Sequence, residues 1–206
     1  MEMKEIRAFD CEFRAENDEE HGHYIVGRPI VFNSRTNLGW YDEIIEAGAL
    51  NTTDLKDVRL LVNHNTDMIP LARSRNNTEN STMQLLPVEG VGLDMRADLD
   101  TENNSDAKSL YSAIERGDIT GMSFMFVVDS DSWDDIDSDH PTRHIRSIKR
   151  VMEVSAVTFP AYSATSISTR GLSDALDSAR TSLESVKAKL REKERKKAKI
   201  KILMEV

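Results

Sequence analysis

Three polar side chains lie in apolar, strand-like segments, and the first of them is Ser123. It is the one hydroxyl group in residues 121–128, a run that starts at Gly121 and ends in two valines. Aromatic and β-branched neighbours predict a β-strand, which holds a side chain more rigidly than a loop does. A rigid hydroxyl group suits a nucleophile that attacks a carbonyl carbon. The structural alternative is a strand serine that only hydrogen-bonds inside the fold.

His64 follows directly after the apolar run of residues 58–63. If this run is a strand, its period of two places His64 on the same face as Val58, Leu60 and Val62, with the imidazole projecting at the strand's end. An imidazole in such a position can serve as a general base. The alternative is a histidine that only bonds a backbone carbonyl.

Glu153 interrupts a third apolar run, residues 151–162. A buried, unpaired carboxylate costs several kcal/mol, so this side chain needs a cationic or hydrogen-bonding partner. A histidine would supply one, but so would Lys149 or Arg150, and exposure on an edge strand would remove the need. Together, Ser123, His64 and Glu153 provide the nucleophile, the base and the orienting acid that acyl transfer requires.

Short β-like runs separated by turn residues must position these three side chains. So many short strands predict a barrel or a sandwich. A helix capped by Ser105 and stopped by Gly117 leads directly into the strand of Ser123, and a shorter helical piece is expected over residues 42–47. The acidic residues 129–140 are expected to form a surface loop, because they lack the glycine and the final glutamate of a calcium loop. The candidate strands are residues 6–13, 24–32, 58–63, 83–87, 92–99, 120–128 and 145–157.

The composition changes after residue 170 to Ala, Ser, Leu, Lys and Glu, which predicts a domain over residues 1–170 and a helical tail over residues 171–206. Apolar residues recur in the tail at alternating steps of four and three. This spacing fits either a short coiled coil or an amphipathic helix folded onto its own domain. The apolar positions are Leu172, Leu176, Ala179, Leu183, Val186 and Leu190.

Charge is distributed unevenly along the 206 residues, whose net charge is −9. The last 20 residues carry nine Lys or Arg and three Glu, a net charge of +6, so residues 1–186 carry −15. An acidic body argues against a nucleic-acid surface, since phosphate contacts need clustered cations. The basic tail is more typical of a solvated helix face than of a nucleic-acid site.

Composition also argues against a membrane protein, a disulfide-stabilised protein and a metalloenzyme. No apolar run approaches the roughly 20 residues that cross a bilayer, and residues 1–7 lead into no signal-peptide core, so a cytoplasmic location is expected. The single cysteine, Cys11, excludes an internal disulfide and zinc sites made of several thiolates. His21-Gly22-His23 is a weak metal motif for which a surface loop is the better interpretation. No cofactor and no metal are expected.

Five stretches, taken in order, resemble the prohead (head maturation) proteases of tailed bacteriophages, serine peptidases distantly similar to herpesvirus assemblins. Each stretch alone is a weak signal, but the ordered set between residues 24 and 168 is specific. Met125 departs from the pattern, because many members have glycine there, and Ala161-Tyr162 stands where assemblins have an arginine pair. The stretches are residues 26–34 (VGRPIVFNS), 43–50 (EIIEAGAL), 61–65 (LVNHN), 116–124 (RGDITGMSF) and 153–162 (EVSAVTFPAY).

The resemblance implies a mainly β, α+β domain, an assemblin-like β-barrel surrounded by a few helices. It implies a serine endopeptidase with Ser123 as nucleophile, His64 as general base and then acid, and Glu153 as the orienting third member. The implied substrates are scaffolding segments of the capsid, from the major capsid protein or a separate scaffold, and the enzyme itself. Cleavage would take place inside the assembling prohead in the host cytoplasm. Assemblins gain activity by dimerising, so the analogy extends to a homo-oligomer.

The competing interpretation is a non-enzymatic capsid assembly or scaffold protein with an inactive, protease-like barrel. In that case Ser123, His64 and Glu153 are structural. Self-cleavage that Ser123→Ala abolishes would distinguish the two functions. In the protease interpretation, residues 171–206 are a candidate segment for recruiting the enzyme to a helical scaffold.

Overall fold

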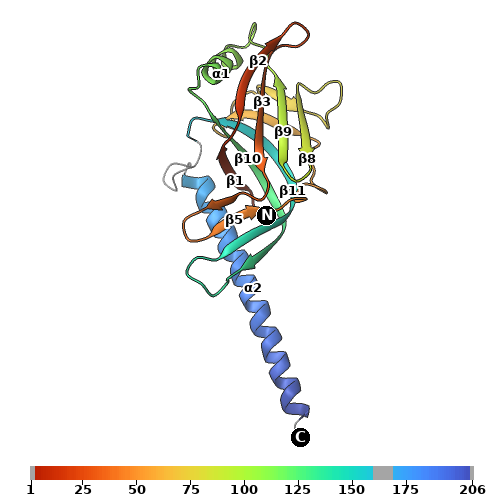
Figure 1. The fold of residues 1–206 in the computed structure, drawn as a ribbon, viewed down its shortest axis with the longest axis vertical. Coiled ribbons are helices and arrows are strands. Elements are labelled where there is room, and N and C mark those ends of the chain that lie inside the picture. The colour runs from red at the N-terminus through yellow and green to blue at the C-terminus, as the bar shows by residue number, and fades with distance from the viewer. Residues whose placement is uncertain (1–2, 160–168, 205–206) are drawn as a thin grey trace.

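A computed structural model describes residues 3–159 and 169–204 of the chain (Figure 1). Strands dominate these residues and form two β-sheets, one of seven strands and one of four. Two helices accompany the sheets, α1 (Ser105–Glu115) and the much longer α2 (Thr169–Met204). The described part of the chain is therefore mainly β with an α+β arrangement, as predicted. Its strands form two separate sheets, and no closed barrel is present among the described residues.

The larger sheet is organised around a long antiparallel hairpin of β10 (Gly121–Asp134) and β11 (Thr142–Val157). On its other side β10 pairs with β1 (Glu5–Asp10). β11 pairs in parallel with two short strands, one near its start and one near its end. These and the two remaining strands of this sheet are β5 (Asp42–Ile45), β6 (Val58–Val62), β4 (Arg35–Asn37) and β7 (Ala72–Ser74).

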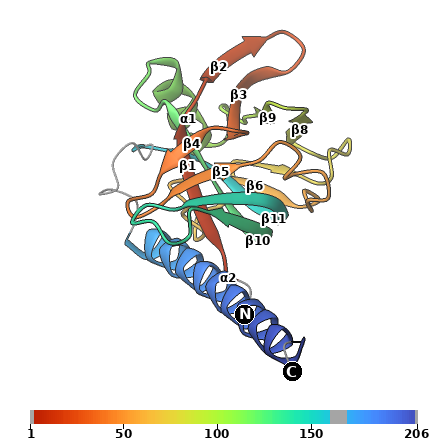
Figure 2. The same cartoon turned by 60° about the horizontal axis from the view of Figure 1, so that its bottom comes forward.

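The smaller sheet packs against the larger one, and the main hydrophobic core lies between them (Figure 2). On β10, Met122, Phe124 and Phe126 are fully buried in this core. A Cβ atom added at Gly27 would lie 2.5 Å from the sulfur of Met122, so a larger residue there would require the Met122 side chain to move. The four antiparallel strands of the smaller sheet are, in spatial order, β2 (Phe13–Asp18), β3 (Gly22–Val31), β9 (Gly92–Asp98) and β8 (Met83–Val88).

α2 is docked over its first half and projects beyond the body over its second half (Figure 1). Ala179 and Leu183 are buried against Tyr41 and Trp133. From residue 188 to residue 200 every side chain is exposed. Over residues 176–186 the apolar spacing therefore belongs to an amphipathic helix folded onto its own domain, the second of the two interpretations. No helix in the described part of the chain is both long and apolar enough to span a membrane.

A buried cluster of ionised side chains joins β1, β5, β10 and β11. Arg7 donates to Glu43, with an Nε–Oε1 distance of 2.5 Å, and to Glu5 at 2.6 Å. Arg143 donates to Glu5 at 2.8 Å and to Asp131 at 2.7 Å. Charges removed from water are tolerated only when they are paired and hydrogen-bonded. Arg7 contacts two carboxylates, and Arg143 contacts three, because it also donates to Glu43 at 3.3 Å.

Most of the predicted strands are confirmed, and the exceptions have physical reasons. Residues 6–13 form two strands in different sheets, β1 and β2, because the chain crosses from one sheet to the other at Cys11. The apolar pattern continues across the break because Phe9 and Phe13 both pack into the same core. The confirmed strands are β3, β6, β8, β9, β10 and β11, whereas β2, β4 and β7 were not predicted as separate strands.

Three other predictions were wrong in whole or in part. Residues 42–45 form strand β5 instead of a helical piece, with Glu43 and Ile45 alternating into the buried side. Residues 129–134 continue β10, so only the residues between Asp134 and Thr142 form the expected acidic loop. The predicted helix before Ser123 is present as α1, but its N-cap is Asn104, whose side chain accepts the first helical N–H groups.

Candidate active site

His64 and Glu153 form a hydrogen-bonded pair across the larger sheet. Their Nδ1 and Oε1 atoms are 2.5 Å apart, although the residues are 89 positions apart in the chain. The Glu153 side chain is 4% exposed and the His64 side chain 14% exposed. The buried carboxylate thus has the histidine partner that its burial requires. Because Nδ1 faces a carboxylate, it carries the imidazole proton and leaves Nε2 as the basic nitrogen.

A left-handed turn at the end of β6 brings His64 to Glu153. Asn63 has a φ of 50° and His64 a φ of 56°, a region that residues other than glycine rarely adopt. Asparagine tolerates it better than most, because its short side chain can bond nearby backbone. The turn moves His64 over the face of β11 that carries Glu153 and Ser155. The prediction that His64 continues the face of Leu60 was therefore wrong, because the period of two ends with the strand.

Residues near the end of β11 hold this turn in place. The backbone N–H of Asn63 donates to the backbone carbonyl of Ala156 at 2.9 Å. The Asn63 side chain accepts from the backbone N–H of Thr158 and donates to its hydroxyl group, both at 3.0 Å. The backbone N–H of His64 donates to the hydroxyl group of Ser155 at 3.1 Å. The position of the base is therefore set by side chains that are 91 to 95 residues away in sequence.

Ser155 also contacts the carboxylate. Its Oγ donates to Oε2 of Glu153 at 2.5 Å, while Oε1 of Glu153 faces His64. Both carboxylate oxygens are thus engaged, which fixes the plane of the group. Hydrogen bonds to an ionised acceptor are about twice as strong as neutral ones.

Ser123 lies beside this network on the neighbouring strand. It is the register partner of Ser155 in the β10–β11 pair, so both side chains point to the same face of the sheet. The Cβ atoms of directly opposed residues are typically about 4.5–5.5 Å apart. Ser123 is fully buried, and its Oγ donates to the carbonyl of Arg7 on β1 at 2.8 Å. Among the hydrogen bonds of the described residues, none joins Ser123 to His64.

The structure therefore gathers Ser123, His64 and Glu153 on one face of the larger sheet, and it adds residues that sequence reasoning missed. Ser155, Asn63 and Thr158 were not singled out. The period of two offered a signal for Ser155, because a residue two positions after Glu153 on a strand must share its face. No local signal identifies Asn63 and Thr158, whose pairing depends on the parallel contact between β6 and β11.

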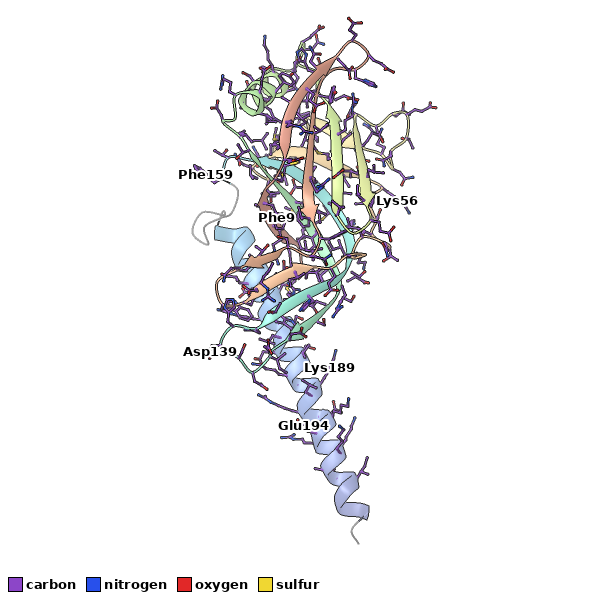
Figure 3. All side chains as sticks on the ribbon, in the orientation of Figure 1. Phe9, Lys56, Asp139, Phe159, Lys189 and Glu194 are labelled. Carbon is purple, nitrogen blue, oxygen red and sulfur yellow. The ribbon has the colours of Figure 1, made fainter. Side chains whose placement is uncertain are left out.

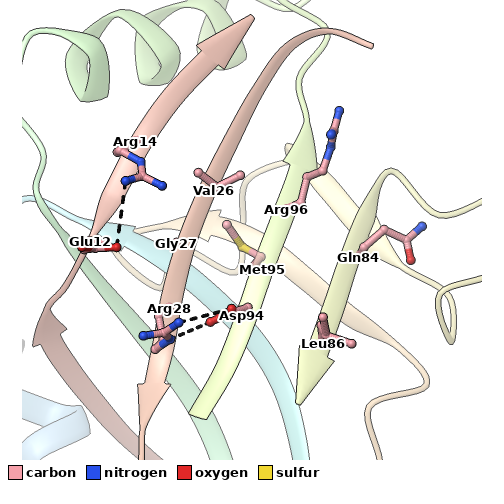
Figure 4. Close-up of a pocket in the computed structure, with 10 residues that line it drawn as sticks. All are labelled: Glu12, Arg14, Val26, Gly27, Arg28, Gln84, Leu86, Asp94, Met95 and Arg96. Atoms are coloured by element: carbon pink, nitrogen blue, oxygen red, sulfur yellow. Dashed lines mark hydrogen bonds and ion pairs between the residues drawn. The ribbon is translucent and has the colours of Figure 1, made fainter. Parts of the chain in front are cut away.

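Other polar features of the described residues lie apart from this site. His21 contacts Asp18, whereas His23 contacts Thr101, so the two histidines do not converge. No three metal-binding side chains cluster within residues 3–159 and 169–204. A hollow of about 340 Å³ on the smaller sheet is lined by paired charges, including Arg28 and Asp94, and by none of the three candidate residues (Figure 4).

Comparison with known protein families identifies a match over most of the chain. The family model described as Caudovirus prohead serine protease matches residues 9–178, most of the chain. No curated protein and no solved structure matches. The matched range contains Ser123, His64, Glu153 and Ser155, and it extends into the docked half of α2.

Proposed function

The chain belongs to the Caudovirus prohead serine protease family, and we propose that it is a serine endopeptidase of capsid maturation. In this proposal Ser123 is the nucleophile, His64 is the general base and then acid, and Glu153 orients His64. The observation that carries it is the 2.5 Å bond between His64 and Glu153 on the face that also holds Ser123. This is the base–acid pair that a serine nucleophile requires.

The reaction follows from these positions. A serine hydroxyl group is a weak nucleophile near neutral pH, so His64 Nε2 takes its proton as Oγ attacks the scissile carbonyl, which contributes a factor of about 10² to 10⁴ in rate. Glu153 stabilises the imidazolium that forms. His64 then returns the proton to the leaving amine, and water releases the acyl group from Ser123 by the same steps.

The described conformation is proposed to be a resting one. Ser123 is fully buried and its hydroxyl group is engaged with Arg7, so it must rotate about χ1 to face His64. Serine side chains occupy three staggered rotamers, and exchanging one for another gives up only a single hydrogen bond, about 1 kcal/mol. Contact with a substrate or a second copy of the enzyme would favour the active rotamer.

The proposed substrates are scaffolding segments inside the assembling prohead, within the host cytoplasm. They are the N-terminal domain of the major capsid protein or a separate scaffold protein, followed by the enzyme itself. In this proposal residues 1–170 are the protease domain and residues 171–206 are a segment that recruits it.

The projecting half of α2 supports the proposal for recruitment. Lys189 and Glu194 lie on this segment, beyond the body of the protein (Figure 3). Residues 187–206 are strongly basic, because they contain nine Lys or Arg residues and only three Glu. We therefore propose an acidic segment of the scaffold or of the inner shell as its partner, because opposite charges steer association.

Co-expression with the adjacent capsid gene tests the proposed function. Mass spectrometry of the products should show cleavage with the natural chain and none with Ser123→Ala. Ser130→Ala is the matched control, because Ser130 is an exposed serine on the same strand. Undiminished processing by Ser123→Ala, with the fold intact, would contradict the assignment.

The second candidate is a non-enzymatic capsid assembly protein with an inactive protease fold. The observation that favours it is the bond from Ser123 to Arg7, which is the contact of a structural strand serine. Under this alternative the natural chain and Ser123→Ala give the same uncleaved products and the same proheads.

A further inference from the structure

We infer that Ser155 is a positioning residue of this active site, one hydroxyl group that fixes both the carboxylate of Glu153 and the backbone of His64. The inference rests on the proposed function, because it concerns the same pair of residues. Ser155 lies in β11 between β10 and β6, and it is fully buried. Its hydroxyl group is engaged with Glu153 and with the backbone of His64, so it acts on the pair without contacting a substrate.

The hydrogen bonds of Ser155 use its hydroxyl group in both directions. Its Oγ donates to Oε2 of Glu153 at 2.5 Å and accepts the backbone N–H of His64 at 3.1 Å. A hydroxyl group has one donor and two acceptor positions, so both bonds form at once. With Oε2 held, the other oxygen of Glu153 is directed at Nδ1 of His64. The carboxylate torsion is otherwise broad, so this second contact restricts it.

The left-handed turn explains why the backbone of His64 needs such support. Left-handed residues other than glycine cost on the order of 1–3 kcal/mol each and persist only where the surroundings hold them. Two occur in succession here, Asn63 and His64. Thr158 bonds the side chain of Asn63, whereas His64 receives its backbone contact from Ser155. Removing the hydroxyl group leaves a backbone N–H and a carboxylate oxygen unpaired, which frees the turn to relax.

The consequence for catalysis is specific. Ser155 faces Ser123 across the β10–β11 pair, so a displaced His64 would be out of place for the attacking hydroxyl group. A group that positions the base without touching the substrate affects kcat, and it leaves KM nearly unchanged. A residue that matters only for folding would instead lower the amount of folded enzyme.

Three substitutions isolate the hydroxyl group. Ser155→Thr keeps the hydroxyl group and adds a methyl group. Ser155→Val has the volume of the threonine variant but lacks the hydroxyl group, and Ser155→Ala removes the hydroxyl group without adding bulk. We expect kcat to fall about 10- to 100-fold in the Val and Ala variants, with KM within about twofold, and to recover in the Thr variant. Ser74→Ala, which removes another buried serine hydroxyl group, should leave kcat unchanged. A Val variant with natural kcat, or a Thr variant that falls as far as Val, would overturn the inference.

A readout independent of proteolysis separates this inference from the proposed function. The Nδ1 proton of His64, assigned by its loss in His64→Ala, should give a downfield proton NMR signal in the natural chain and in Ser155→Thr. We expect it to be shifted or broadened in Ser155→Val. An unchanged signal in Ser155→Val overturns the positioning role, even if cleavage depends on Ser123. If instead Ser123→Ala leaves cleavage intact while the signal responds as expected, the proposed function fails and the positioning role stands.

Discussion

The hydroxyl group of Ser178 on α2 donates to Oε1 of Glu5 on β1 at 2.8 Å, although 173 residues separate them. A second contact lies one turn further along the helix, where Ser182 bonds Asp131 and accepts the indole N–H of Trp133. α2 is thus attached to two of the three carboxylates that pair with Arg143. Docking of the helix and pairing of the buried charges stabilise each other.

Acid should loosen this attachment. Burial alone would raise the pKa of Glu5, but Arg7 and Arg143 outweigh it and hold the pKa below its usual 4.5. A carboxyl group whose pKa is lowered by folding contributes stability above its unfolded pKa and loses it as pH falls through the folded value. We expect the free energy of unfolding of the natural chain to fall below about pH 4.5, measured by chemical denaturation between pH 6 and pH 3.

Glu5→Gln isolates this contribution. The variant should be less stable at neutral pH by about 3–5 kcal/mol, because two arginines lose a buried partner. Its stability should depend less steeply on pH than that of the natural chain. Glu12→Gln, at a side chain that is 83% exposed, is the control and should follow the natural curve. Parallel pH curves for Glu5→Gln and the natural chain would contradict the prediction.

Glu153→Gln should lower kcat by at least about 100-fold while the protein still folds. The amide cannot stabilise the imidazolium, and its NH₂ group competes with Nδ1 for the role of donor. The chain offers a matched control, because Glu46 contacts Nδ1 of His144 at 2.7 Å away from the site. Glu46→Gln should keep the natural rate in the same peptide-cleavage assay. Equal rates for the two variants would refute the role of Glu153.

A chain that ends at Val186 should keep its stability and lose recruitment. The docked side chains Ala179 and Leu183 remain, so the thermal midpoint should not change. Peptidase activity on a short peptide should persist, while the amount of enzyme that co-sediments with proheads falls several-fold. A full-length chain with Lys193, Lys196 and Lys197 changed to Gln tests whether charge is responsible. Undiminished incorporation of the truncated enzyme would contradict the role of the tail.

Gly92→Ala should prevent the smaller sheet from forming correctly. A Cβ atom at this position would lie 2.0 Å from the carbonyl oxygen of Ile30, within the β3–β9 pair. Backbone cannot move aside as a flexible side chain can, so we expect a large loss of soluble, folded protein. Gly90→Ala has open space around it and should cost only about 1 kcal/mol from its positive φ. Similar thermal midpoints for both variants would contradict this account.

Local sequence patterns were sufficient for part of the fold. Alternating apolar residues identified the β10–β11 hairpin strands, and the apolar setting of Glu153 required a partner that the structure supplies in His64. Local patterns failed at Glu43, where they predicted the wrong secondary structure. Its neighbours favour a helix, but it lies on strand β5, which pairs with the remote strand β11, and its buried carboxylate pairs with Arg7, 36 residues earlier.

The sequence pointed to the three candidate residues of the site, but it did not show the contacts that hold His64 in position. The apolar settings of the three candidates, together with the family resemblance of the stretches around them, singled them out. Ser155 could have been placed on the face of Glu153 by its spacing, but its bond to the backbone of His64 depends on the turn after β6. That turn breaks the period of two, so no extrapolation from Leu60 could position the imidazole. Contacts between remote strands decide such positions, and a single sequence does not display them.

The dependence of His64 on Ser155 and Thr158 has a consequence for when activity can arise. A growing polypeptide in which β11 is unfinished already contains Ser123 and His64, but it has nothing to hold the turn that places the base. Proteolytic competence in the proposed mechanism is therefore acquired only with β11, the last strand among the described residues. In that mechanism partly synthesised chains would cut nothing around them, and the order of translation would delay the first cut.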